Sequence, residues 1–392
     1  MNMAMTMKDF LLEQTKELTF LSLDIRELFK DKNIDFDKEA VEIPVLLEDL
    51  SSKLQKNDEE FVITTEILVK GITYLLGVDP NFKYREEYIR ILESLSPDIL
   101  KALLILGNKT FDQGEKIKGM IFLKGATTVN SKDSKALFNY AVALLTVAED
   151  LRNEENPHDF KASQERIGIF QEEARFQLEK LIDLEPEHAL AFYHLGFLYK
   201  KDSLFQKAEI FWEKALEFGL EEHLEEHVYT LLREIEDLVK YERGYQKVLQ
   251  GDLASGLKEL IELEERYPEW WNLQFFIGLA YRQQEQYSKA ITYFQRVIEL
   301  EERIPDPYVE IALSFAGLGK YHKAIEYFEK ALEKDPNSGE ILSNLAMVNL
   351  ETGDLKNAEK YIEASLKVNP DDEITLACKE KLDLLKQNLG EK

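Results

Sequence analysis

The feature that most constrains this chain is a sequence pattern that recurs every 34 residues. Residues 317–337, GLGKYHKAIEYFEKALEKDPN, align without a gap with residues 351–371, ETGDLKNAEKYIEASLKVNPD. Extending the same step toward the N-terminus gives seven blocks over 100–372, with extra residues near 151–170 and 223–236. The blocks begin at positions 100, 134, 189, 237, 271, 305 and 339. A fixed period of this length predicts an array of similar units.

Every block carries a small residue at two places. The eighth place holds Gly107, Ala141, Gly196, Gly244, Gly278, Ala312 and Ala346. The twentieth place holds Gly119, Ala174, Ala208, Gly256, Ala290, Ala324 and Ala358. Small residues let two helix backbones approach closely, and larger neighbours such as Trp212 and Phe294 fill the space beside them. The pattern therefore predicts two crossing helices in each block.

These blocks resemble the tetratricopeptide repeat (TPR), a helix–turn–helix unit that stacks on its neighbours. The resemblance covers 100–372 and implies an all-α, superhelical solenoid of seven repeats. Residues 373–392 then form a C-terminal capping helix with the single cysteine, Cys378. Residues 221–249 are predicted to be one long helix.

Residues 1–99 lack the repeat but have helical patterns, so we expect an N-terminal helical bundle. One degenerate repeat is expected near 59–95. The predicted helices are 7–30, 38–56, 59–77 and 83–95. No alternating strand pattern is recognised anywhere in the chain.

Composition limits the compartment and the partners. The net charge is -26, and residues 1–99 alone hold 12 Lys and Arg against 21 Asp and Glu. This sign is wrong for binding nucleic acid or anionic membranes. With one cysteine, no signal peptide and no apolar membrane span, the sequence predicts a cytoplasmic protein without intrachain disulfides.

One short motif, HLEEH at 223–227, fits the pattern of two zinc-binding histidines on a helix with a general-base glutamate. A zinc hydrolase is therefore a remote alternative. Zinc catalysis also requires a third ligand and a shaped cleft, and His223 and His227 lie at the border of an apolar stripe. We interpret them as solvent-border residues. No phosphate-binding loop, dinucleotide fingerprint or nucleophile elbow occurs, so the sequence predicts a non-enzymatic protein without cofactors.

The TPR resemblance implies a binding surface, because the first helices of such repeats line a concave groove. The fifth and ninth places of the blocks would face it, and the middle repeats make that lining aromatic. Asn108, Asn139 and His194 also occupy places of the carboxylate clamp of some TPR co-chaperones, but the clamp's cations are missing. The candidate groove residues are Asn108, Phe138, Asn139, Val142, Tyr193, His194, Phe197, Tyr241, Tyr245, Phe275 and Leu279.

We therefore expect an adaptor or scaffold that binds a peptide or helix of a protein partner. The alternative is a peptide-responsive bacterial regulator, because a helical region before about seven repeats is similar in architecture to Rap-type signalling proteins. Cations precede anions along the predicted groove, from Lys101 and Lys135 to Glu340 and Glu351. A bound segment would then lie with its acidic end toward the early repeats.

Overall fold

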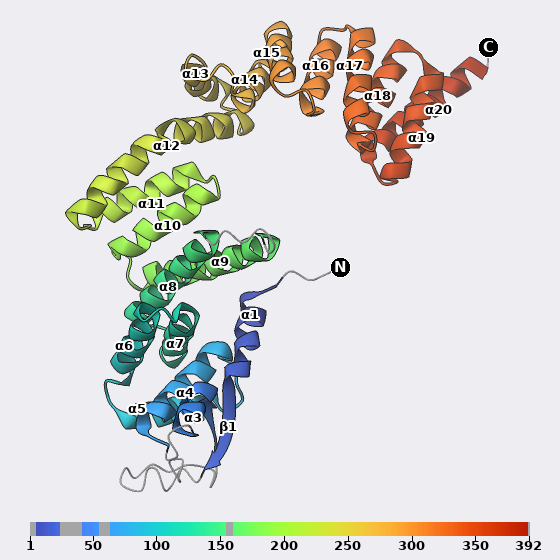
Figure 1. Ribbon diagram of the computed structural model, residues 1–392. Coiled ribbons are helices and arrows are strands. Elements are labelled where there is room, and N and C mark those ends of the chain that lie inside the picture. The colour runs from blue at the N-terminus through green and yellow to red at the C-terminus, as the bar shows by residue number, and fades with distance from the viewer. Residues whose placement is uncertain (1–4, 24–40, 55–62, 154–159, 391–392) are drawn as a thin grey trace. The chain divides into compact units, whose positions relative to one another are not determined.

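The computed structural model describes residues 5–23, 41–54, 63–153 and 160–390 (Figure 1). They divide into two compact units, Met1–Thr230 and Leu231–Lys392. Both units consist mainly of successive pairs of helices, which confirms the all-α class and the repeat solenoid.

The first unit contains a short two-stranded sheet and the earlier helix pairs. Its elements are α1 (Met7–Glu13), η1 (Gln14–Glu17), β1 (Leu18–Leu23), β2 (Val41–Leu46), α3 (Leu47–Leu54), α4 (Thr65–Val78), α5 (Arg85–Leu95), α6 (Ile99–Asp112), α7 (Lys116–Val129), α8 (Ser134–Asn153), α9 (Phe160–Leu184), α10 (Ala189–Lys201) and α11 (Phe205–Glu217). The predicted long helix is α12 (Glu222–Leu249), which begins in the first unit and ends in the second.

The second unit continues the helix pairs. Its elements are α13 (Leu253–Glu264), α14 (Trp271–Gln283), α15 (Tyr287–Leu300), α16 (Asp306–Gly317), α17 (Tyr321–Lys334), α18 (Gly339–Thr352), α19 (Leu355–Val368) and α20 (Glu373–Gly390). Helix α20 packs on α18 and α19, with Cys378 and Leu382 buried in the contact.

The small residues lie where the helices of a pair cross. A Cβ atom added to Gly196 of α10 would stand 2.3 Å from Nε1 of Trp212 on α11. One added to Gly278 of α14 would stand 2.9 Å from the ring of Phe294 on α15. Ala312 and Ala324 are fully buried at the corresponding places of α16 and α17. The predicted close approach is confirmed, and the large residues fill the space that the small ones leave.

A second periodic feature is a left-handed residue in the turn between paired helices. Gly114, Gly251, Gly319 and Gly353 have φ between +72° and +93°, and all occupy the fifteenth place of a block. Ser203 and Glu285 occupy the same place, with φ of 59° and 61°. The turn geometry is therefore kept even where the residue is not glycine.

The N-terminal region differs from the prediction. The helix at the start of the expected 7–30 ends at Glu13, and residues 41–46 of the expected helix 38–56 form strand β2. The strands pair antiparallel from Leu18 opposite Leu46 to Leu23 opposite Val41. Pro44 gives one physical reason, because proline inside a helix removes a hydrogen bond and clashes with the preceding turn. Parts of both predicted helices, and the start of the one at 59–77, lie outside the described residues.

Helix α4 joins this small sheet to the helix pairs. A Cβ atom on Gly71 would stand 1.8 Å from the carbonyl oxygen of Pro44, so α4 crosses β2 in direct backbone contact. A Cβ atom on Gly77 would stand 2.2 Å from the carbonyl oxygen of Ile121 on α7. The two glycines hold α4 against both neighbours. A degenerate repeat near 59–95 stays a prediction.

Candidate functional site

Two of the predicted groove residues meet between α6 and α8. The side-chain amide of Asn108 donates to Oδ1 of Asn139 over 3.3 Å, and Asn139 in turn donates to the carbonyl oxygen of Lys135 over 2.7 Å. Both side chains are half-buried. Their amides are therefore used partly within the protein, and this end of the surface is held in a fixed arrangement.

The ring of Phe138 on α8 contacts two histidine rings. Its centroid is 5.0 Å from the ring of His188 and 5.8 Å from the ring of His194. Burial lowers the pKa of His194 to about 4, and the nearby His188 adds to this effect. His194 is therefore neutral at physiological pH, which excludes a role as a fixed cation. Val142, one helical turn after Phe138, is half-buried.

The predicted aromatic residues of α10 form a cluster with HLEEH. Tyr193 and Phe197 meet edge to face at 5.1 Å, and the phenolic oxygen of Tyr193 lies 2.9 Å from Nδ1 of His227. Phe197 also contacts Trp212, whose indole N–H donates to the carbonyl oxygen of Tyr193 over 3.1 Å. Tyr193 is thus held at its backbone and at its hydroxyl. The sequence pattern did not predict that His227 contacts a candidate groove residue.

A hollow of about 310 Å³ lies beside this cluster. It is lined by Leu145, Glu149, Arg152, Gln171, His194, Phe197, Leu198 and Lys201. Arg152 pairs with Glu149 at 2.6 Å, and Lys201 donates to the neutral amide oxygen of Gln171. The lining therefore carries two cations and one anion around an apolar wall, in a chain whose net charge is -26.

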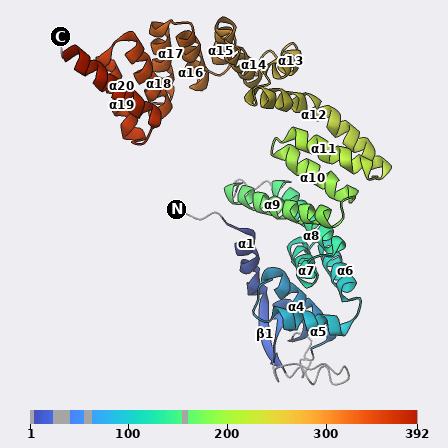
Figure 2. The same ribbon diagram turned by 180° about the vertical axis from the view of Figure 1, so that it is seen from behind.

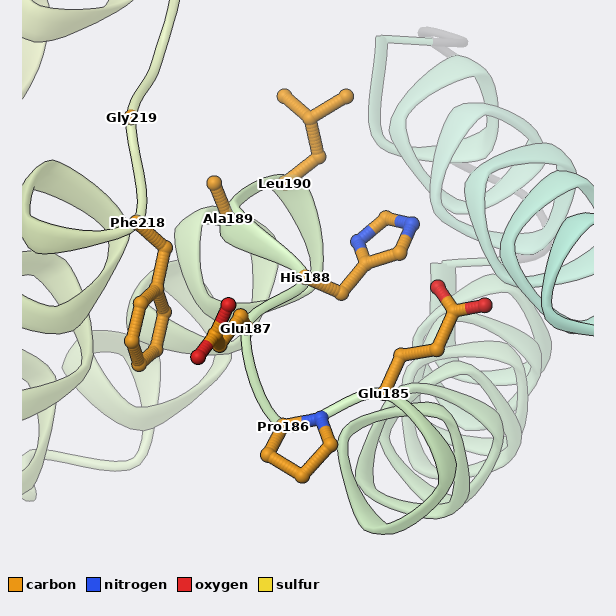
Figure 3. A pocket seen from close by; sticks show the side chains of 8 residues that line it. All are labelled: Glu185, Pro186, Glu187, His188, Ala189, Leu190, Phe218 and Gly219. Carbon is orange, nitrogen blue, oxygen red and sulfur yellow. The ribbon is translucent and has the colours of Figure 1, made fainter.

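A larger and shallower hollow of about 660 Å³ opens at the other end of α10 (Figure 3). Glu185 and His188 extend to one side of the loop before α10, and Phe218 stands on the other side. Nδ1 of His188 accepts the N–H of Ala191 over 3.2 Å and caps α10, while Glu185 accepts from the hydroxyl of Ser134. The exposed side of α10 is thus flanked by a hollow at each end.

The candidate residues of the second unit are packed more tightly. Tyr241 lies 4.2 Å from Trp270, and Tyr245 stacks on Phe276 at 4.9 Å. These four rings cover one another, and burial raises the pKa of Tyr241. Such rings can contact a ligand only through the parts that remain exposed.

The remaining two candidates lie in the hydrophobic core of the second unit (Leu279) or pack against it while partly buried (Phe275). Phe275 contacts Phe294 at 5.6 Å, and Leu279 is only 7% exposed within the hydrophobic core. The ninth place of a block therefore does not guarantee exposure. Leu279 stabilises the repeat in this structure and offers almost no surface to a partner.

Charges along the second unit are also partly neutralised. Arg282 on α14 forms an ion pair with Glu310 on α16, and burial raises the pKa of Glu310 against the opposing effect of Arg282. Glu351 pairs with Lys381 at 2.6 Å beside a hollow of about 410 Å³ between α18 and α20. These residues therefore pair within the unit.

The metal-binding interpretation of HLEEH has little structural support. The side chain of His223 is 71% exposed and lies 3.6 Å from Glu221, whereas His227 contacts Tyr193. Within the part of the chain that the structure describes, no group of three His, Cys, Asp or Glu residues could hold a metal ion. In the same part, no helix is both long and apolar enough to cross a membrane.

Comparison with known proteins identifies the repeat. Residues 271–304 and residues 315–377 each match a family model described as tetratricopeptide repeat. A search among curated proteins gave no match.

The chain is also similar to several solved structures. They include YrrB, a TPR protein with an unusual peptide-binding site (18% identity, 66% of this chain and 97% of that chain, TM-score 0.27). PilW, a type IV pilus biogenesis factor, is 16% identical over 60% of this chain and 97% of that chain, with a TM-score of 0.39. The TPR domain of Sgt2 from Aspergillus fumigatus is 22% identical over 31% and 80%, with a TM-score of 0.28. From the two matching segments and the paired helices with small residues at their crossings, this chain is a tetratricopeptide repeat protein.

Proposed function

We propose that this protein is a non-enzymatic adaptor that binds a segment of another protein along the exposed side of α10. The binding groove is defined by Tyr193, His194, Phe197 and Lys201. The observation that carries the proposal is the hollow of about 310 Å³ that His194, Phe197 and Lys201 share with α8 and α9. TPR repeats serve protein–protein interaction in general, and this hollow is large enough for one side chain of a partner.

The lining indicates the chemistry of the bound segment. Phe197, Leu198 and Leu145 offer an apolar wall, which favours an apolar side chain. Lys201 is bonded to a neutral amide, so that contact does not compensate its charge. An acidic residue next to the apolar one would meet this charge, and the same charge would steer the partner to the groove.

The fixed aromatic cluster supports the same function. The hydrogen bonds that Tyr193 shares with Trp212 and His227 hold it in one orientation before any partner binds. A rigid aromatic surface gives contact area at low cost in conformational entropy. We therefore expect Tyr193 and Phe197 to be the anchors of the interface.

The test begins with affinity capture by the intact protein, followed by titration of the captured partner against variants. Phe197→Ala should weaken binding at least tenfold, because truncating a central anchor costs on the order of 2 kcal/mol. Lys201→Gln should weaken binding less and reduce its dependence on salt. The matched control is Phe176→Ala, which removes a ring that is 60% exposed on α9 and does not line the hollow. Full binding by a folded Phe197→Ala protein would remove the α10 groove from consideration.

A further inference from the structure

The two strands of the N-terminal sheet have very different outer edges. On β2, the hydroxyl of Tyr88 donates to the carbonyl oxygen of Glu42 over 2.5 Å, and Pro44 has no N–H to donate. Ile43 and Val45 are fully buried, and α4 lies against the backbone at Pro44. The outer edge of β2 is therefore closed to further pairing.

Pro44 also determines which groups of β1 point outward. Opposite residues in an antiparallel pair either exchange two hydrogen bonds or none, and proline cannot donate one. Phe20, which is opposite Pro44, is consequently in a non-bonded pair. Its N–H and carbonyl point away from β2, and so do those of Leu18 and Ser22, two residues to either side. The N–H of Leu18 donates to the carbonyl oxygen of Thr15 in η1. Among the described residues, no other backbone hydrogen bond joins β1 to an element other than β2.

Strand β1 lacks the features that usually protect an edge. Its sequence, LTFLSL, contains no charge, proline or glycine, and the strand pairs without a bulge. The side chain of Phe20 is 41% exposed, and its ring stacks on Phe82 at 6.1 Å. Figures 1 and 2 draw β1 along the margin of the N-terminal region from both sides. An uncharged, apolar edge of this kind can take up an additional strand.

The surrounding charge selects the occupant. Residues 13–23 and 41–49 contain Lys16 and five carboxylates. Glu48 and Asp49 form ion pairs with Lys118 and Lys70. The remaining three, Glu13, Glu17 and Glu42, outnumber Lys16 and leave the surroundings of β1 acidic. A second copy of this chain would bring the same acidic surroundings to the edge and be repelled. An extended segment with basic flanking residues would instead be attracted.

We propose that β1 is a docking edge for an extended, lysine- or arginine-flanked segment of another protein. The segment adds to the sheet as a third strand by bonding the outward N–H and carbonyl groups of Phe20 and Ser22 and the outward carbonyl group of Leu18. This surface is separate in sequence from the α10 groove, and its use does not depend on that groove.

The test uses the full chain and a synthetic peptide of alternating valine and threonine with two lysines at each end. Amide hydrogen exchange is followed residue by residue. The outward amides of Phe20 and Ser22 should exchange roughly tenfold more slowly with peptide, while Thr19 and Leu21 change little because β2 already protects them. The amide of Leu18 should also change little, because it is already bonded to Thr15. A peptide with glutamates in place of the lysines should protect them far less.

Two variants of one residue separate backbone pairing from side-chain contact. Ser22→Pro removes an outward N–H and should abolish peptide binding, whereas Ser22→Ala keeps that N–H and should bind normally. If Ser22→Pro does not fold, the hydrogen-exchange measurement on the unmodified chain tests the proposal by itself. Unchanged exchange of the Phe20 and Ser22 amides at millimolar lysine-flanked peptide would overturn the proposal. Protection that rises with protein concentration alone would also overturn it, because the occupant would then be a second copy.

Discussion

The phenolic oxygen of Tyr193 on α10 lies 2.9 Å from Nδ1 of His227, near the start of α12. The residues that extend α12 thus support the proposed groove. A hydrogen bond between exposed side chains contributes about 0.5–1.5 kcal/mol. Tyr193→Phe and His227→Ala should each lower the free energy of unfolding by about this amount. The double variant should lower the free energy of unfolding by less than the sum of the two single changes. A double-mutant cycle measured by urea unfolding would show this difference.

The control for this cycle is His223→Ala, at the other histidine of HLEEH. Its side chain is 71% exposed, so the free energy of unfolding should stay within about 0.5 kcal/mol of the parent. Strict additivity of Tyr193→Phe and His227→Ala would show that the hydrogen bond contributes nothing in solution.

Replacing Glu285 or Ser203 with glycine should stabilise the protein. Both have a positive φ at the place where other repeats have glycine. A left-handed conformation costs a residue with a side chain roughly 1 kcal/mol, and glycine avoids this cost. Glu285→Gly and Ser203→Gly should therefore each raise the free energy of unfolding by about 0.5–1 kcal/mol. Gly319→Ala should lower it by a similar amount, and thermal unfolding of all three would test the shared turn geometry.

Two glycines in helices should respond to alanine in opposite directions. At Gly196 the added methyl would collide with Trp212, and overpacking of this kind costs about 1–3 kcal/mol. At Gly168 on α9 nothing lies within 4 Å of the added atom, so alanine should stabilise the helix by about 0.5–1 kcal/mol. Chemical denaturation of both variants measures the difference. Equal effects would show that α10 and α11 do not cross as described.

Acid should destabilise the first unit through His194. Its folded-state pKa is about 4, below the value near 6.5 expected for an unfolded chain. Between these values the unfolded chain binds more protons, so stability is fully present above about pH 6.5 and falls as the pH drops toward 4. The share due to His194 is up to about 3 kcal/mol.

This pH dependence is measured by urea unfolding between pH 7 and pH 4. His194→Gln cannot be protonated, so it should lose less stability across the interval than the parent does. His223→Gln, which changes an exposed histidine, should keep the parent's full dependence. An identical slope for His194→Gln and the parent would contradict the buried, neutral state of His194.

Much of the fold could be predicted because repetition makes local signals reinforce one another. Gly196 and Gly278 were recognised as crossing points since equivalent residues are small in every block. The sequence also carries a signal for the left-handed place at Glu285, because Gly251, Gly319 and Gly353 stand at the same step of their blocks. Strands β1 and β2 were missed, although Pro44 argued against a helix through 38–56.

The site was less predictable because exposure depends on contacts between repeats. Phe197 borders a hollow, whereas Leu279, which is also at the ninth place of its block, is buried. The contact of His227 with Tyr193 arises from the length of α12, which no single repeat encodes. The repeat period predicts which side of a helix a residue lies on. Contacts with neighbouring helices decide whether that residue is exposed to solvent.

The ion pair between Arg282 and Glu310 limits where this chain can be divided into fragments. Each residue belongs to a different block, and each provides the other's countercharge in a half-buried setting. A fragment that ends at Leu300 keeps the cation without its partner, and one that begins at Pro305 keeps a carboxylate that burial already disfavours. Blocks 271–304 and 305–338 are therefore not interchangeable modules, and shuffling either one alone would require both charges to be replaced together.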